Sequence, residues 1–240
     1  MTSYDAPPDC KLEKLEEYKK TMQTLSEPTI IFNKENNRRT YKYSDNDVKY
    51  GQKTFCINLL DYSFLAASVT SITSYTSNGK RLDKVTCTGY VDENLIVLEN
   101  VKMKKTIGRG NCTKAVAYLI KTLMLEAKKG SRNLFPHKGT VYVSSKNACA
   151  AANCYIKAFM LNGFDYDKEE LKKFQDNVKI NGDVDYELNF KNKKQEQEQK
   201  RIDYQDNARP TKRQRRWSPR LPMVLGDVPS NKVLSFNLKF

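Results

Sequence analysis

The hydrophobic positions along the chain change their period several times, and each period predicts an element. Apolar residues at three- and four-residue steps predict helices over Lys11–Ser26 and Cys112–Lys129. An alanine-rich stretch that stops at Asn162-Gly163 predicts a third helix over Lys146–Leu161. Alternating or continuous β-branched and apolar residues predict strands over Thr29–Phe32, Phe64–Tyr75, Lys84–Val91, Leu95–Val101, Thr140–Ser144 and Val184–Phe190. Helices and strands together predict a mixed α/β fold.

Two stretches between these elements carry weaker patterns. Asn33–Gly51 is rich in Asn, Asp, Lys and Tyr, which predicts a long loop, and Thr54–Leu60 is either another strand or the end of that loop. Leu171–Asn177 is a weak helix candidate. Asn78-Gly79 between two strand patterns indicates a tight hairpin, so the three strands from Phe64 to Val101 are expected to form an antiparallel meander.

The composition changes at Lys191, which predicts a domain over residues 1–190 and a basic, partly disordered extension over residues 191–240. Lys191–Arg201 has almost no apolar residue and reads as a linker or an exposed helix. Leu221–Phe240 regains apolar residues. Two interpretations of this last segment stay open: it folds back onto the domain, or it binds a partner.

Basic residues outnumber acidic ones, 42 to 28, which gives a net charge of +14. The excess is concentrated in Asn100–Thr140, with ten basic residues and one acidic residue, and in Lys191–Arg220, with eleven and four. Such a balance favours an anionic partner. No apolar run approaches 18 residues and Met1–Cys10 has no signal-peptide pattern, so we expect no membrane partner and an intracellular protein.

The six cysteines form no C-x-x-C pair, and His137 is the single histidine. This spacing gives no support for a zinc site, and we expect no bound metal. The cysteines are expected to be reduced, mostly buried thiols. One histidine, placed in a Lys- and Gly-containing loop, gives little support for a Ser-His-Asp or Cys-His mechanism.

The segment Leu95–Lys121 has the pattern of an anion site: a buried strand, a basic glycine loop and an amphipathic helix. Gly108 and Gly110 let backbone N–H groups approach a phosphate, and the helix start adds free N–H groups. Positive potential comes from Lys102, Lys104, Lys105, Arg109 and Lys114. The alternative is a tight strand-to-helix turn with solvated lysines. The loop is neither a Walker loop nor a dinucleotide fingerprint.

The order of elements and two motifs resemble the general-control-type N-acetyltransferase (GNAT) superfamily. That family's central loop reads [QR]-x-x-G-x-[GA], and Lys105–Gly110 matches it with Lys in the first place. The family's Asn-x-x-Ala and Tyr-x-x-x-Gly-Phe resemble Asn147–Ala150 and Phe159–Phe164. The resemblance covers about Phe64–Phe190. It implies a mainly antiparallel, centrally splayed sheet flanked by helices, and acetyl-CoA as the cofactor.

The resemblance also implies which residues hold the CoA thioester. Strand groups of Leu98 to Val101 would meet the pantetheine amides, and Asn147 would contact the end region of the cofactor. The loop and helix start would bind the pyrophosphate, through Lys105, Ile107, Gly108, Arg109, Gly110, Asn111 and Cys112.

Transfer of an acetyl group to an amine needs a base and a proton donor. Family members often use a carboxylate on the strand before the loop, where Glu99 stands; the alternative is a solvent-facing glutamate. The family's tyrosine acid aligns with Phe159. Tyr155 lies one turn earlier and could replace it, or it is an ordinary core or surface tyrosine.

In the extension, Lys212, Arg213, Arg215 and Arg216 form a short basic cluster. It resembles a nuclear-localisation address, it could contact the phosphates of a nucleic acid, or it is a solvated tail. The location is therefore the nucleus if the address works and the cytoplasm otherwise. Three functions remain: an N-acetyltransferase with an unknown amine acceptor, an inactive GNAT-like scaffold or protein-interaction module, and a nucleic-acid-binding protein.

Overall fold

The protein is described from a computed structural model, which covers residues 15–35, 38–47, 51–61, 65–76, 79–103, 111–129, 134–145, 148–181 and 184–208. The chain divides into two compact units, Met1–Arg201 and Ile202–Phe240. In chain order the elements are α1 (Leu15–Thr21), β1 (Thr29–Asn33), β2 (Arg38–Asp47), β3 (Gly51–Asp61), β4 (Ala66–Thr76), β5 (Gly79–Asp92), β6 (Leu95–Met103), α2 (Asn111–Lys129), β7 (Lys138–Ser145), α3 (Ala148–Leu161), β8 (Asp165–Tyr166), α4 (Lys168–Asn181), β9 (Val184–Lys191) and α5 (Lys193–Ala208).

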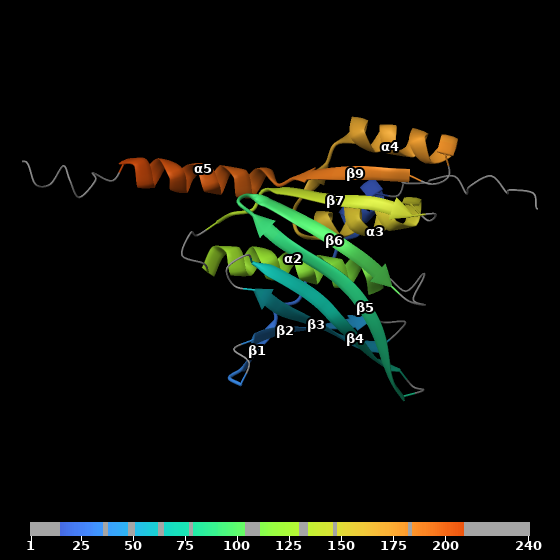
Figure 1. The fold of residues 1–240 in the computed structure, drawn as a ribbon, viewed down its shortest axis with the longest axis vertical. Helices are drawn as coiled ribbons and strands as arrows, with labels where there is room; N and C mark the ends of the chain where they lie inside the picture. Colours follow the sequence, from blue (N-terminus) through green and yellow to red (C-terminus); the bar gives the residue numbers. More distant parts are fainter. Residues whose placement is uncertain are drawn as a thin grey trace, which may run out of the picture. The chain divides into compact units, whose positions relative to one another are not determined.

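The strands form one nine-stranded sheet in the order β1-β2-β3-β4-β5-β6-β7-β9-β8 (Figure 1). Every neighbouring pair is antiparallel except β6 and β7, which run parallel. The prediction of a mixed α/β fold with a mainly antiparallel sheet is confirmed. The predicted meander corresponds to β4, β5 and β6.

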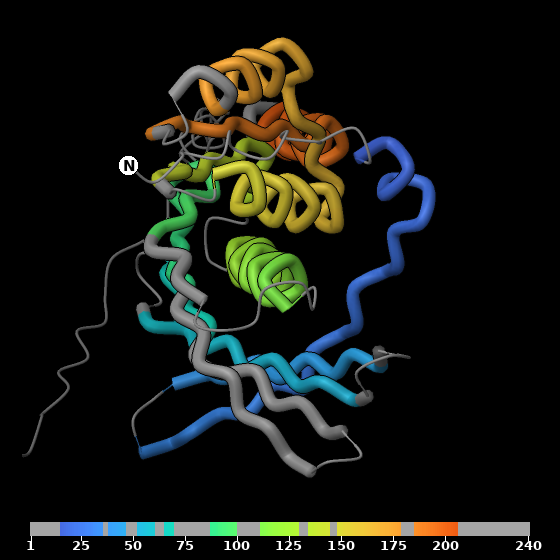
Figure 2. The backbone as a smooth tube through the Cα atoms, turned by 90° about the vertical axis from the view of Figure 1, so that its right-hand side faces the viewer, coloured from blue at the N-terminus to red at the C-terminus, as the bar shows by residue number. Residues whose placement is uncertain are grey.

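The helices α2 and α3 lie on the same side of the sheet (Figure 2). An aromatic layer fills the space between α2 and the β2–β3 pair: Tyr118 of α2 stacks on Tyr43 with 4.4 Å between ring centroids and meets Phe55 at 5.1 Å. Because these rings are fully buried, they contribute much of the hydrophobic stabilisation of this half.

A buried carboxylate fixes the C-terminal end of α2 to β2. Glu126 is only 4 % exposed. It accepts a hydrogen bond from the Tyr41 hydroxyl and another from Arg39 Nη1 at 3.1 Å, and its second cationic neighbour is Lys129 Nζ at 3.3 Å. Burial and the Glu126 carboxylate raise the pKa of Tyr41. The charge is therefore satisfied inside the fold, as a buried ion requires.

The predicted loop over Asn33–Gly51 is wrong, because β2 occupies most of it. Tyr41 and Tyr43 alternate along β2 and are fully buried. Their hydroxyl groups meet Glu126 and Thr122, the latter at 2.8 Å, on a helix about 80 residues later in the chain. A polar-looking segment thus becomes an interior strand because distant polar groups satisfy its tyrosines.

Other elements differ from the prediction mainly at their ends. The first helix ends at Thr21 rather than near Ser26, and residues 11–14 lie outside the described part. The weak helix near Leu171 is longer than predicted and forms α4. The predicted stop at Asn162-Gly163 is confirmed: Gly163 has φ of +81°, and the Phe164 N–H donates a hydrogen bond to the Phe159 carbonyl at 3.1 Å, which closes α3.

A second aromatic group packs α3 on β7 and β9. The Phe159 ring stacks on Phe190 at 4.1 Å and meets Phe164 edge-on at 5.3 Å. Gly139 of β7 lies under the Phe159 ring, where a Cβ would overlap the ring atoms. A glycine is therefore required at this position by the close approach of the phenylalanine.

Candidate functional site

The pairing of the two parallel strands ends before the strands do. β6 and β7 pair from Leu95–Lys138 to Leu98–Val141. Among the described residues the pairing stops there, although β6 continues to Met103 and β7 to Ser145. Beyond Leu98, β6 remains paired with β5 and β7 with β9. Backbone groups of β6 and β7 that would bond each other therefore face a gap in the middle of the sheet.

An extra residue distorts β6 at the same place. Thr88 of β5 pairs with Glu99, and Thr86 pairs with Lys102. Between these two pairs β6 advances by three residues and β5 by only two. Such a bulge bends the strand and redirects its side chains. The Glu99 side chain is exposed, whereas Leu98 before it is buried on the side of the helices. Glu99 thus lies on the exposed face of the sheet, one residue beyond the last β6–β7 pair.

The helix α2 begins at Asn111, and its first turn contains no acidic residue. Its first N–H groups, including that of Cys112, have no partner within the helix, and they carry the positive end of the helix dipole. Lys114 in this turn pairs with Asp45 at 3.1 Å, so much of its charge is already balanced. The predicted loop residues Lys105, Ile107, Gly108, Arg109 and Gly110 lie outside the described residues.

Tyr155 lies in the middle of α3, on the opposite side of the sheet from Glu99. It is 6 % exposed, and burial, with a smaller contribution from Cys87, raises its pKa to about 12. Cys87 is the β5 residue between Thr86 and Thr88, where the bulge lies. The tyrosine is therefore held neutral near the bulged end of β6.

The other predicted site residues divide into those that the structure describes and those that lie outside the described part. Leu98 is buried against the helices, and the backbone of Val101 belongs to β6 beyond the last β6–β7 pair. Asn147 and the basic cluster from Lys212 to Arg216 lie outside the described residues. Phe159 is buried in the ring stack on Phe190 and offers no proton.

The expectation of reduced thiols is wrong for Cys112 and Cys154, which form a disulfide bond with 6.1 Å between their Cα atoms. Cys149 is disulfide-bonded as well, whereas Cys56 and Cys87 are free. The two bonded residues are 42 positions apart and meet only because α2 packs beside α3. Spacing along the chain does not reveal such a meeting.

Sequence reasoning missed Tyr142, which stands on β7 one residue beyond the last pair, as Glu99 does on β6. It is 60 % exposed and pairs in register with Glu187 of β9. Thr140 donates a hydrogen bond to the Glu187 carboxylate at 2.8 Å. The alternation in Thr140–Ser144 places Tyr142 on the polar face, which was the only sequence signal for it.

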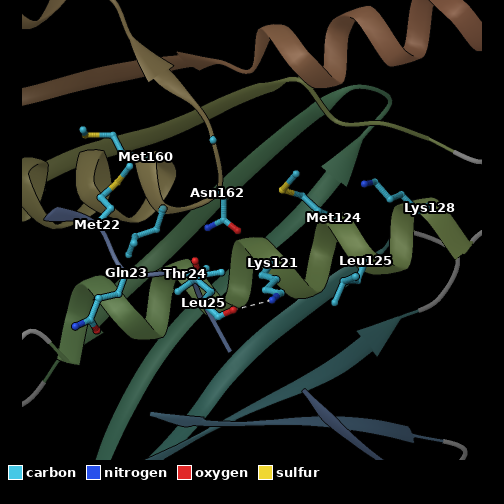
Figure 3. Close-up of a pocket in the computed structure, with 12 residues that line it drawn as sticks. Met22, Gln23, Thr24, Leu25, Lys121, Met124, Leu125, Lys128, Met160 and Asn162 are labelled. Atoms are coloured by element: carbon cyan, nitrogen blue, oxygen red, sulfur yellow. Dashed lines mark hydrogen bonds between the residues drawn. The ribbon is translucent and has the colours of Figure 1, made fainter. Parts of the chain in front are cut away.

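A separate pocket of about 470 Å³ lies between Met22–Leu25 and the C-terminal halves of α2 and α3 (Figure 3). Three methionines line it: Met22, Met124 and Met160. Lys121 at its edge donates hydrogen bonds to the carbonyls of Leu25 and Ser26, at 3.2 and 2.9 Å. This lysine fastens the segment before β1 to α2, and no predicted site residue lines the pocket.

Neither a family model, nor a curated protein, nor a solved structure matches this chain. Within the described residues, none of the helices has the length and apolar character needed to cross a membrane. The same part of the chain brings no three His, Cys, Asp or Glu side chains together as metal ligands.

Proposed function

We propose that the domain binds acetyl-CoA in the gap between β6 and β7 and transfers the acetyl group to an amine. The observation that carries this proposal is the early end of the β6–β7 pairing inside an otherwise continuous sheet. Strand groups left without a partner strand suit a ligand rich in amides, because such a ligand can replace the missing ladder. The resemblance to the GNAT superfamily points to the same gap.

The start of α2 supports the phosphate half of the proposal. Its N–H groups, among them those of Asn111 and Cys112, suit a pyrophosphate, and no acidic residue in the first turn opposes one. Leu98 and Val101 would flank the pantetheine arm, and Lys105 to Gly110 and Asn147 would add the contacts that the resemblance implies. Acetyl-CoA, when bound, supplies the thioester carbonyl that an amine attacks.

Two side chains are suited to move protons on opposite faces of the gap. Glu99 on the exposed face would accept a proton from the ammonium form of the acceptor, because only the neutral amine attacks. Attack of the amine on the thioester carbonyl breaks the C–S bond and releases the CoA thiolate. Tyr155 on the helix side, held neutral by burial, would donate its hydroxyl proton to this thiolate. The acceptor would approach from the face that carries Glu99.

Calorimetric titration with CoA tests the binding half of this proposal. We expect saturable binding; no heat and no thermal shift at millimolar CoA would remove it. For turnover, CoA release is measured with a panel of primary amines. Glu99→Gln is expected to lower the rate about a hundredfold, the ordinary contribution of a general base.

Matched variants separate these roles from general effects. Glu187→Gln removes an exposed carboxylate from the same face and should keep the wild-type rate. Tyr155→Phe should slow turnover without weakening CoA binding, whereas Tyr166→Phe at the far edge of the sheet should do neither. Wild-type rates in both Glu99→Gln and Tyr155→Phe would dismiss the two roles and leave CoA binding standing.

A second candidate is a GNAT-like domain without catalysis that serves as a scaffold or protein-interaction module. The burial of Phe159, in the place where the family carries its tyrosine, favours it. CoA binding without acetyl transfer to any amine would decide for this candidate. Nucleic-acid binding through the basic loop and the cluster from Lys212 to Arg216 stays a prediction, tested by the salt dependence of binding.

A further inference from the structure

A covalent bond joins the two helices that carry the residues of the proposed site. Cys112 is the second residue of α2, and it is bonded to Cys154 in the middle of α3. The backbone N–H of Cys112 belongs to the helix start that we assign to the pyrophosphate, and Tyr155 follows Cys154 directly. The bond therefore fixes the first turn of α2 relative to the turn of α3 that carries Tyr155.

Apart from the buried Asn111 and the Lys114–Asp45 ion pair, the other contacts of α2 named here lie further along the helix. Asn162 at the end of α3 donates hydrogen bonds to the carbonyls of Ala117 and Ala158, at 3.0 and 2.9 Å. Tyr118 and Glu126 hold the later turns to β2 and β3. In the first turn, the Lys114–Asp45 ion pair is a flexible side-chain contact. Loss of the disulfide would therefore loosen the first turn while the rest of α2 stays packed.

The two sulfur atoms differ in access. Cys112 is half-buried, whereas Cys154 is 8 % exposed. The thiolate of a small thiol would attack Sγ of Cys112 and release the Cys154 thiolate, which takes a proton from solvent. A second small thiol then displaces the first from Cys112. Two small thiols are oxidised to one disulfide, and the protein disulfide is reduced to two thiols.

We propose that the Cys112–Cys154 bond is a thiol-sensitive control of the CoA site. In the oxidised protein the bond holds the N–H groups at the start of α2 in the arrangement that receives the pyrophosphate. Reduction lets this turn move and weakens CoA binding, because the binding energy must then also order the turn. The inference rests on the proposed function, since it concerns the regulation of the same site.

The test compares CoA affinity in the oxidised protein, in protein reduced with dithiothreitol, and in Cys112→Ser and Cys154→Ser. Reduction is expected to raise the dissociation constant about tenfold, within the usual range of coupling between sites. Each serine variant should have the weak affinity with or without the reductant. This separates the bond from Cys149, which the reductant also reaches. Cys56→Ser, which removes a free cysteine of β3, should keep the full response.

Hydrogen exchange of the α2 amides supplies a readout that needs neither CoA nor a variant. Reduction should speed exchange at residues 115 and 116, whose amides bond within the helix, and leave residues 119–123 unchanged. An equal CoA affinity in both redox states, or a serine variant that still responds to dithiothreitol, would overturn the control. If CoA binds in neither state, the proposed function fails. Faster exchange confined to the start of α2 would then still show that the disulfide holds this part of the helix, and unchanged exchange would refute that role.

Discussion

Two pairs of neighbouring strands in the same sheet have opposite characters. β2 and β3 pair at eight positions, from Thr40–Asn58 to Asp47–Gly51, and their buried rings meet Tyr118 of α2. β6 and β7 pair at four positions and then part, and the side chains that follow are the exposed Glu99 and Tyr142. The comparison teaches that the two halves of one sheet are built differently: the β2–β3 half is covered by a buried aromatic layer that supplies stability, whereas the β6–β7 pairing ends early, at the gap where we propose that the ligand binds.

The largest expected effect comes from emptying the aromatic layer. Tyr118→Ala removes a fully buried ring that stacks on Tyr43 and contacts Phe55, and it should lower the free energy of unfolding by about 4 kcal/mol. Urea denaturation measures this loss. The matched variant Tyr142→Ala removes the exposed ring beside the gap and should change stability by no more than about 0.5 kcal/mol. Equal losses in the two variants would erase the contrast between the two halves.

A smaller loss is expected from the buried carboxylate. Glu126→Ala leaves the Tyr41 hydroxyl and the Arg39 guanidinium without their acceptor. Since Arg39 is partly exposed and can be rehydrated, the expected loss is about 2 kcal/mol rather than the full cost of an unpaired buried charge. Glu99→Ala, on the exposed face near the gap, should leave the urea midpoint unchanged. A stable Glu126→Ala protein would show that this cluster does not secure α2.

Segments with a clear local pattern of hydrophobic residues were predicted correctly, and segments without one were missed. The amphipathic α2, the meander and the alanine-rich α3 were found because their patterns are local. The strand β2 was missed because its buried positions are tyrosines, whose burial depends on Thr122 and Glu126 far along the chain. The Cys112–Cys154 bond depends in the same way on helix packing.

The candidate site was predicted less completely than the fold. Glu99 and the start of α2 were named from the order of a strand, a glycine loop and a helix. The gap is defined by backbone groups that have no partner strand. The pattern of side chains along the sequence does not show where strand pairing ends. A splayed sheet was expected only through the resemblance to a family and stays a prediction, and Tyr142 was not considered.

The last effect is absent at neutral pH and appears only in alkaline solution. Burial raises the pKa of the Cys87 thiol to about 12, from an ordinary value of 9.0. Between these values the unfolded chain loses the thiol proton and the folded protein keeps it, so stability present below pH 9 is lost as the pH rises toward 12. Within this window the free energy of unfolding falls by about 1.4 kcal/mol per pH unit. Cys87→Ala should flatten the alkaline part of the stability curve; an unchanged slope would mean that this thiol is not shielded.

The most direct test of the central claim is a crystal structure of the protein grown with CoA. The account predicts that CoA lies between β6 and β7 beyond Leu98 and Val141, with its pyrophosphate at the N-terminal end of α2. CoA bound elsewhere, or a gap that remains closed by protein side chains at millimolar CoA, would contradict the account.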